Sequence, residues 1–127
     1  MSENFVSFSN GVVVVNTTPH PITFLDGDSV VTVPTAALVN ARAVEEQVSS
    51  LFVRTNFVGC DEGEQALSEI QAAFAESGIS GELVIVGSII AAQAYPGRVV
   101  AMTPAPGFER VAPAEKRMNP GKFTTFA

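Results

Sequence analysis

The side chains of this chain that are best suited to chemistry are cations and aromatic rings that alternate in its last quarter. Guanidinium and ammonium groups hold phosphate, and flat aromatic faces stack on bases. The pattern is typical of a nucleotide clamp, in which arginines bind phosphate and an aromatic ring stacks on the base. The alternating residues are Tyr95, Arg98, Phe108, Arg110, Lys116, Arg117, Lys122, Phe123 and Phe126. Of these, we expect Arg98, Arg110 and Arg117 to bind phosphate, and Phe108 or Tyr95 to stack on the base.

The same pattern also fits a surface between two copies of the chain. Phe123 and Phe126 lie in a polar, proline-broken segment with few apolar neighbours, and aromatic and arginine side chains are common anchors of protein interfaces. We therefore expect a homo-oligomer. The two interpretations are compatible, because small-ligand sites often form where two subunits meet.

The cations stand out because the rest of the chain is acidic. Residues 1–97 hold two basic and eleven acidic side chains, a balance of −9, whereas residues 98–127 hold five basic and two acidic ones, a balance of +3. This asymmetry indicates a site for an anion or for a complementary face of another copy. The alternative is that the cations pair with the acidic body. A net charge of −6 argues against duplex nucleic acid as the main partner.

Polar side chains near the end of the first predicted strand form a second candidate group. His20 lies between two prolines, where it can donate a proton to a bound anion or fix the turn by bonding backbone carbonyls. Asn16 likewise has a functional and a structural interpretation. The structural one is that asparagine side chains form hydrogen bonds with the backbone of their own turn. Arg54 is a further candidate ligand residue, which points away from the more apolar face of a strand predicted over residues 51–57.

Catalytic chemistry is not indicated by the sequence. A transition-metal site needs three or four His, Cys or carboxylate ligands, and the sole histidine and sole cysteine, His20 and Cys60, are 40 residues apart. Cys60 has no local basic activator, and the glycine-rich loops that enclose a nucleotide phosphate are missing. We therefore expect a protein that is not an enzyme and that uses no metal and no cofactor.

The composition predicts one folded domain over residues 1–127. Hydrophobic residues make up 46% of the chain and charged residues 16%, which lies well away from the disordered regime and supports a sizeable core. The single cysteine cannot form an internal disulfide, the first ten residues lack a secretion signal, and no apolar run is long enough to span a bilayer. We expect a cytoplasmic protein without a membrane partner.

Hydrophobic periodicity predicts an α+β fold with a mostly antiparallel sheet. A hairpin is expected around Asp26 and Gly27. Residues 35–48 sustain neither the helical nor the strand period of apolar residues, and we expect an extended segment there. Prolines predict an irregular, basic C-terminal segment over residues 104–127. The predicted strands cover residues 12–15, 22–24, 30–33, 51–57, 83–86 and 98–102.

One main amphipathic helix is predicted over about residues 62–77. Asp61 is a candidate N-cap, Gly78 can end the helix in a left-handed conformation, and Leu67 and Ile70 belong to one apolar stripe. A short helix over about residues 89–95 is predicted next, although its first two residues equally suit a longer strand. The run 83–86 is apolar on both faces, which is typical of a central strand.

Two parts of the sequence resemble small proteins encoded by tailed bacteriophages. The first is Asn-Thr-Thr-Pro-His-Pro-Ile at residues 16–22, which resembles an Asn-x-Thr-Pro-His opening followed by a hairpin. The second comprises residues 86–98 and 107–111. In length and layout the chain is similar to the phage Thoeris anti-defence sponge family.

This resemblance implies a non-enzymatic phage protein in the cytoplasm of the infected bacterial host. It would assemble as a homo-oligomer and sequester a small anionic nucleotide signal, either cyclic ADP-ribose or a cyclic oligonucleotide, that a host immune enzyme makes. The resemblance implies phosphate binding by Arg98 and Arg110 and base stacking by Phe108. The alternative function is that of a small structural or assembly accessory of the virion.

Overall fold

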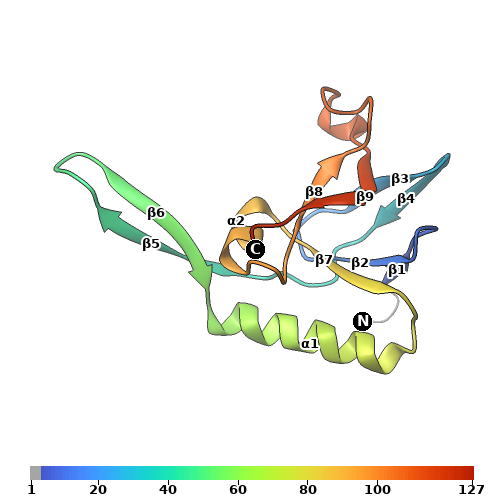
Figure 1. The fold of residues 1–127 in the computed structure, drawn as a ribbon, viewed down its shortest axis with the longest axis horizontal. Coiled ribbons are helices and arrows are strands. Elements are labelled where there is room, and N and C mark those ends of the chain that lie inside the picture. The colour runs from blue at the N-terminus through green and yellow to red at the C-terminus, as the bar shows by residue number, and fades with distance from the viewer. Residues whose placement is uncertain (1–3) are drawn as a thin grey trace.

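The computed structural model describes residues 4–127, and its strands form three separate sheets (Figure 1). The first sheet has the order β1-β2-β7. Its β1 (Val6–Ser7) runs antiparallel to β2 (Val12–Asn16), and its β7 (Glu82–Val86) runs parallel to β2. Most of β2 is buried, in keeping with its unbroken run of β-branched residues.

The position of β7 differs from the central strand that the sequence predicted. β7 has β2 on one side, but on its other side it pairs, within residues 4–127, only with Val100, through one isolated bridge. There the N–H of Val100 donates to the oxygen of Ile85, and the oxygen of Val100 accepts from Gly87, each at 2.9 Å. β7 is therefore the edge strand of its sheet, and its apolar faces are covered by other layers rather than by neighbouring strands.

The second sheet has the order β4-β3-β9-β8. The predicted hairpin is present as β3 (Ile22–Asp26) and β4 (Ser29–Val33), and Gly27 in its turn has a φ of 62°. β9 (Met118–Thr124) pairs in parallel with β3 and antiparallel with β8 (Ala101–Pro104), so it fills the middle of the sheet. The expectation of an irregular segment over residues 104–127 is therefore wrong for β9, and Pro113–Glu115 form a single 3-10 turn.

The third sheet is a two-stranded hairpin that projects from the body of the molecule (Figure 1), and we call it the arm. It consists of β5 (Ala41–Gln47) and β6 (Val53–Gly59), which within residues 4–127 pair only with each other. The extended conformation expected within residues 35–48 is confirmed for β5. β6 begins and ends two residues later than the predicted strand.

The main helix, α1 (Asp61–Ser77), lies along one side of the molecule, under the first sheet (Figure 1). Its N-cap is Cys60 rather than the predicted Asp61, which instead occupies the first turn with Glu62 and Glu64. There the carboxylates face the positive end of the helix dipole. Gly78 ends the helix in a left-handed conformation with a φ of 74°, as expected.

The core consists of two apolar clusters on opposite sides of β2. Because side chains alternate along a strand, Val13 and Val15 pack with Leu67 and Ile70 of α1, whereas Val14 faces the second sheet. In the cluster between the sheets, the Phe24 ring lies 5.2 Å from that of Phe8 and 6.4 Å from that of Phe123, measured between ring centroids. Phe123 is thus half-buried in its own chain, while Phe126 is 41% exposed.

The second predicted helix is present as α2 (Ile89–Ala94), and Ser88 caps it by accepting a hydrogen bond from the N–H of Ala91. The α+β class with mostly antiparallel strand pairing is confirmed. Within residues 4–127, no helix is long and apolar enough to cross a membrane.

Candidate functional site

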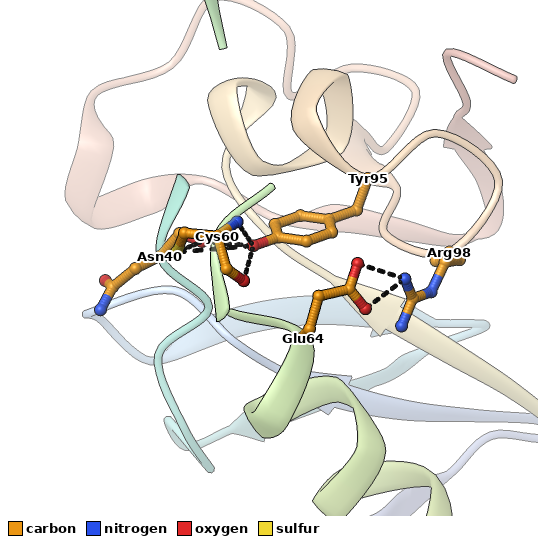
Figure 2. Close-up of polar contacts among 5 residues, drawn as sticks. All are labelled: Asn40, Cys60, Glu64, Tyr95 and Arg98. Atoms are coloured by element: carbon orange, nitrogen blue, oxygen red, sulfur yellow. Dashed lines mark hydrogen bonds and ion pairs between the residues drawn. The ribbon is translucent and has the colours of Figure 1, made fainter. Parts of the chain in front are cut away.

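Tyr95 ties together three elements at the foot of the arm, where β5 and β6 leave the body. Its hydroxyl donates a hydrogen bond to the oxygen of Asn40 at 2.6 Å and accepts one from the N–H of Cys60 at 3.0 Å (Figure 2). Asn40 precedes β5, Cys60 caps α1, and Tyr95 follows α2. Tyr95, expected to stack on a base, is only 2% exposed and acts here as a structural tie.

Two glycines make room for the Tyr95 ring. A Cβ atom on Gly59 would lie 2.8 Å from Cε1 of Tyr95, and one on Gly63 would collide with the Tyr95 hydroxyl and the oxygen of Asn40. Burial is the main cause that raises the pKa of Tyr95, and the nearby Cys60 thiol and Glu64 carboxylate raise it further, against the opposing effect of the Cys60 N–H. The phenol is thus held neutral.

Arg98, a predicted phosphate ligand, is paired within the chain. Its Nη1 lies 2.7 and 2.9 Å from the two carboxylate oxygens of Glu64 (Figure 2), and its guanidinium carbon lies 5.9 Å from the centre of the Tyr95 ring. A phosphate that bound Nη1 of Arg98 would have to displace the Glu64 carboxylate. Arg98 and Tyr95 are therefore brought together as expected, but around a carboxylate of α1.

Asn16 and His20 belong to one turn, in which the side chain of Asn16 has a structural role. Asn16 is fully buried; its amide donates to the oxygens of His20 and Val33 at 2.8 and 3.1 Å, and its oxygen accepts from the N–H and the hydroxyl of Thr18. His20 is exposed at the surface. The structural interpretation thus holds for Asn16, while the His20 ring is open to a ligand.

Arg54 is the second residue of β6, at the end of the strand that follows the turn of the arm. Its Nη1 is 3.4 Å from a carboxylate oxygen of Glu46 on β5, and both side chains are more than half exposed. An exposed pair of this kind contributes little to stability. The structure therefore gives Arg54 no place in a site with Arg98 or Arg110.

The remaining candidates, Phe108, Arg110 and Arg117, lie on two loop segments that contact each other. The N–H of Ala105 donates to the oxygen of Arg117 at 2.8 Å, and Lys116 Nζ lies 3.4 Å from the oxygen of Glu109. Phe108 and Arg117 are half-buried, and Arg110 is exposed. The basic C-terminal segment is thus one folded unit.

This unit borders an apolar recess of about 320 Å³, which we call the Lys116 recess. It lies between Pro21 and the start of β3, which come directly after His20, and the segment that leads into β9. Lys116 is the only charged side chain among the residues that line it, and none of those residues is acidic. The lining residues are Pro21, Ile22, Thr23, Met102, Pro113, Ala114, Lys116 and Met118.

A second, larger hollow of about 680 Å³ opens at the foot of the arm. Arg42 is its only cation, whereas the first-turn residues Asp61 and Glu62 contribute two carboxylates. The acidic lining opposes binding of an anion.

The sequence identified the basic segment but not the recess beside it. Met102 and Met118 carried no signal as ligand contacts, and Lys116 was noted only as one of the interleaved cations. Within residues 4–127, no group of three or more His, Cys, Asp or Glu side chains is placed to hold a metal ion.

Comparison of the chain with protein-family models, with curated proteins and with solved structures finds no match. The chain is an α+β protein with an apolar recess lined by one lysine and with a projecting β-hairpin.

Proposed function

We propose that the chain is a non-enzymatic phage protein that sequesters a small anionic nucleotide signal and so inhibits a host defence. The Lys116 recess carries this proposal. Its walls are formed by proline, isoleucine and methionine side chains, and its charged lining consists of a single ammonium group. Such a surface suits a ligand with a flat, weakly polar part and a phosphate.

The charge around the recess supports an anionic ligand. Arg117 is adjacent to Lys116 in the chain, and the loop that holds Arg110 contacts the Lys116 ammonium group through the oxygen of Glu109. Attraction by several cations raises the local concentration of an anion. The hollow at the foot of the arm lacks this property, because its carboxylates outnumber its one arginine.

The size of the recess limits how much of the ligand it holds. A volume of about 320 Å³ is at the lower end of the roughly 300 to 1,000 Å³ of small-molecule sites. One base with its neighbouring phosphate fits this space. The rest of a cyclic ADP-ribose or cyclic oligonucleotide ligand extends over the loop of Phe108 and Arg110, the residues that the sequence assigned to stacking and phosphate binding.

The other parts of the proposal are a homo-oligomeric state and a location in the cytoplasm of the infected bacterium. Sequestration requires only tight binding, since the ligand is withheld and not transformed. It also explains why a protein with no indicated catalytic residues can oppose an immune enzyme.

Titration calorimetry tests the proposal with cyclic ADP-ribose isomers and cyclic di- and trinucleotides as ligands. We expect heat of binding for one of them, and recovery of the intact ligand after the protein is denatured. Lys116→Ala should weaken binding by about 1.5 to 3 kcal/mol through loss of a charge-assisted contact. Lys122→Ala is the matched control, because Lys122 belongs to the same basic C-terminal segment and is exposed on β9 but does not line the recess.

The proposal fails if none of these ligands gives heat at tens of micromolar protein, or if Lys116→Ala and Lys122→Ala bind equally well. A hydrolysed ligand would instead show an enzyme. The second candidate function, an assembly accessory of the virion, is favoured by the exposed arm, and co-sedimentation of the chain with purified phage particles tests it.

A further inference from the structure

Beyond its foot, where α2 and Tyr95 contact it, the arm lacks, within residues 4–127, the packing that normally stabilises a β-hairpin. An isolated two-stranded hairpin is marginally stable in water, and three or more strands with a covered apolar face are needed for independent stability. Six of the seven residues of β5 and four of the seven of β6 are exposed. Large apolar side chains are exposed both in the strands, at Val44 and Val53, and in the turn that joins them, at Val48, Leu51 and Phe52, with exposed fractions of 42 to 83%.

We infer that the arm is completed by the arm of a second copy of this chain, which pairs antiparallel with β6, centred on Thr55, to form a four-stranded sheet. This inference deepens the homo-oligomeric state proposed above, and it is independent of the nucleotide. It rests on the free edge of β6, on the residues that this register brings together, and on the acidic edge of β5.

The backbone groups of alternate β6 residues point away from β5. The N–H of Val48 donates to the oxygen of Phe52 at 2.9 Å, so the backbone of Phe52 faces β5. Because this direction alternates along a strand and the arm has no register shift, Val53, Thr55 and Phe57 turn their N–H and C=O groups away from β5. A second β6 strand centred on Thr55 aligns these three residues with the same three residues of the other copy.

The side chains of two β6 strands match each other in this register. With Thr55 opposite itself, Val53 lies opposite Phe57 and Arg54 lies opposite Asn56, so that apolar side chains meet apolar ones and the guanidinium meets an amide. Like charges directly opposite each other on a sheet are unfavourable. A register centred on Arg54 places that guanidinium opposite itself. A register centred on Asn56 places Val53 opposite Gly59 and loses the apolar pair.

The other edge of the arm, formed by β5, is acidic. β5 carries the adjacent carboxylates of Glu45 and Glu46 in its exposed outer half. If two β5 edges paired, the Glu45 and Glu46 carboxylates of both copies would lie close together along one short pair of strands, and they would repel each other. Charge therefore selects the β6 edge.

The body of the molecule leaves an apolar place for the tip of the second arm. In the Thr55 register, Phe52 of one copy lies opposite Val58 of the other, close to the foot of the arm, where α2 packs against β6 (Figure 1). Ile89 and Ile90 of α2 are 61% and 46% exposed. The tip of one arm and the α2 surface of the other copy can thus cover each other.

Disulfide trapping tests the register. In a Cys60→Ser background, which removes the sole native thiol, Thr55→Cys is compared with Glu45→Cys. The Cα atoms of a hydrogen-bonded antiparallel pair are about 5.5 Å apart, within the roughly 4.4 to 6.8 Å of disulfides. Glu45 is the cross-strand neighbour of Thr55, so it shares the same face. Two Glu45 positions, however, lie three strand spacings apart, about 14 Å.

We expect mild oxidation to convert most of the Thr55→Cys protein, and little of the Glu45→Cys protein, to a covalent dimer. In light scattering, the full chain should be a dimer, and Thr55→Lys should weaken dimerisation tenfold or more while Glu45→Lys does not. Circular dichroism serves as the check that each variant is folded.

A full chain that is monomeric at tens of micromolar overturns both the proposed homo-oligomer and this interface. A dimer in which Thr55→Cys and Glu45→Cys cross-link equally, or in which Glu45→Cys cross-links more, overturns the interface alone. Neither result tests nucleotide binding, which is measured separately with Lys116→Ala. A monomer that binds vesicles or phage particles through the arm also counts against the inference.

Discussion

The hydroxyl of Tyr95 lies 2.6 Å from the backbone oxygen of Asn40, the residue that precedes β5. This contact joins the end of α2 to the arm across 55 positions of sequence. The same hydroxyl accepts a hydrogen bond from Cys60, where β6 leads into α1. Both strands of the arm are thus fixed to the body by one phenol group.

Removal of the Tyr95 hydroxyl should destabilise the protein without creating a large cavity in its core. Tyr95→Phe keeps the ring but leaves the oxygen of Asn40 and the N–H of Cys60 without this partner. A buried polar group that loses its hydrogen bond costs about 1 to 3 kcal/mol. We expect a decrease of that size in the free energy of unfolding, measured with urea. An unchanged midpoint of urea unfolding would show that water replaces the hydroxyl without loss of stability.

The same residue makes stability depend on alkaline pH. Burial raises the pKa of Tyr95, so the unfolded chain ionises this phenol above pH about 10 while the folded chain keeps it neutral. The neutral Tyr95 phenol therefore makes its full contribution to the free energy of unfolding below pH about 10. That contribution decreases as the pH rises toward the folded-state pKa. The stability of Tyr95→Phe should fall less over this range.

Ultraviolet absorbance gives an independent measurement of this pKa. Tyr95 is the only tyrosine in the chain, so the tyrosinate signal reports this group alone. We expect the signal to appear at higher pH in the folded protein than in urea. Coincident titration curves in the two states would contradict the prediction.

Gly63→Ala should be destabilising although it lies in a helix, where alanine is normally favoured over glycine by about 1 kcal/mol. The new methyl group collides with the Tyr95 hydroxyl and with the oxygen of Asn40, and overpacking of this kind costs about 1 to 3 kcal/mol. Ala66→Gly in the same helix is a comparison in which only helix propensity and half-buried packing change. Thermal melting of Gly63→Ala should show a decreased midpoint, and an increase would contradict the close packing.

Asn16→Ala should affect folding rather than ligand binding. The substitution removes a fully buried side chain that donates to His20 and Val33 and accepts from Thr18. We expect a loss of at least about 2 kcal/mol in unfolding free energy, because more than one buried group loses its partner. His20→Ala is the matched control in the same turn, and its exposed ring should contribute less than about 0.5 kcal/mol to stability.

The elements that could be predicted from sequence are those with local signals. The helix over 61–77 follows from its apolar stripe and from Gly78, and the β3–β4 hairpin follows from alternating residues around Gly27. Strand partners could not be predicted in this way, because the parallel pairs join distant segments. β2 pairs with β7 about 70 positions later, and β3 contacts β9 near Met118.

The prediction failed at β9 for a specific physical reason. Pro120 and Gly121 are normally read as breaks in a strand. Here they lie in an irregular part of the ladder, since Met102 pairs with Phe123 while Pro104 pairs with Met118. Four residues of β9 therefore face a single residue of β8, and Pro120 requires no ladder donor at this bulge.

The candidate site could be predicted only in part. The segments that hold the cations of residues 110–117 contact each other in the fold, because neighbours in sequence remain close on a short folded loop. The pairing of Arg98 with Glu64, 34 positions away, had no local signal. The walls of the Lys116 recess come from segments around positions 21, 102 and 113, which the fold alone brings together.

The central place of β9 in the second sheet also affects how the protein is made. β3 and β4 are synthesised before β9, which begins 85 positions after Val33. At a translation rate of about 5 to 20 residues per second, β9 therefore follows roughly 4 to 17 seconds later. For that interval one edge of β3 has no strand to pair with, and an unpaired edge is a template for other chains. Nascent copies on one messenger are therefore exposed to misassembly until each has completed its final strand.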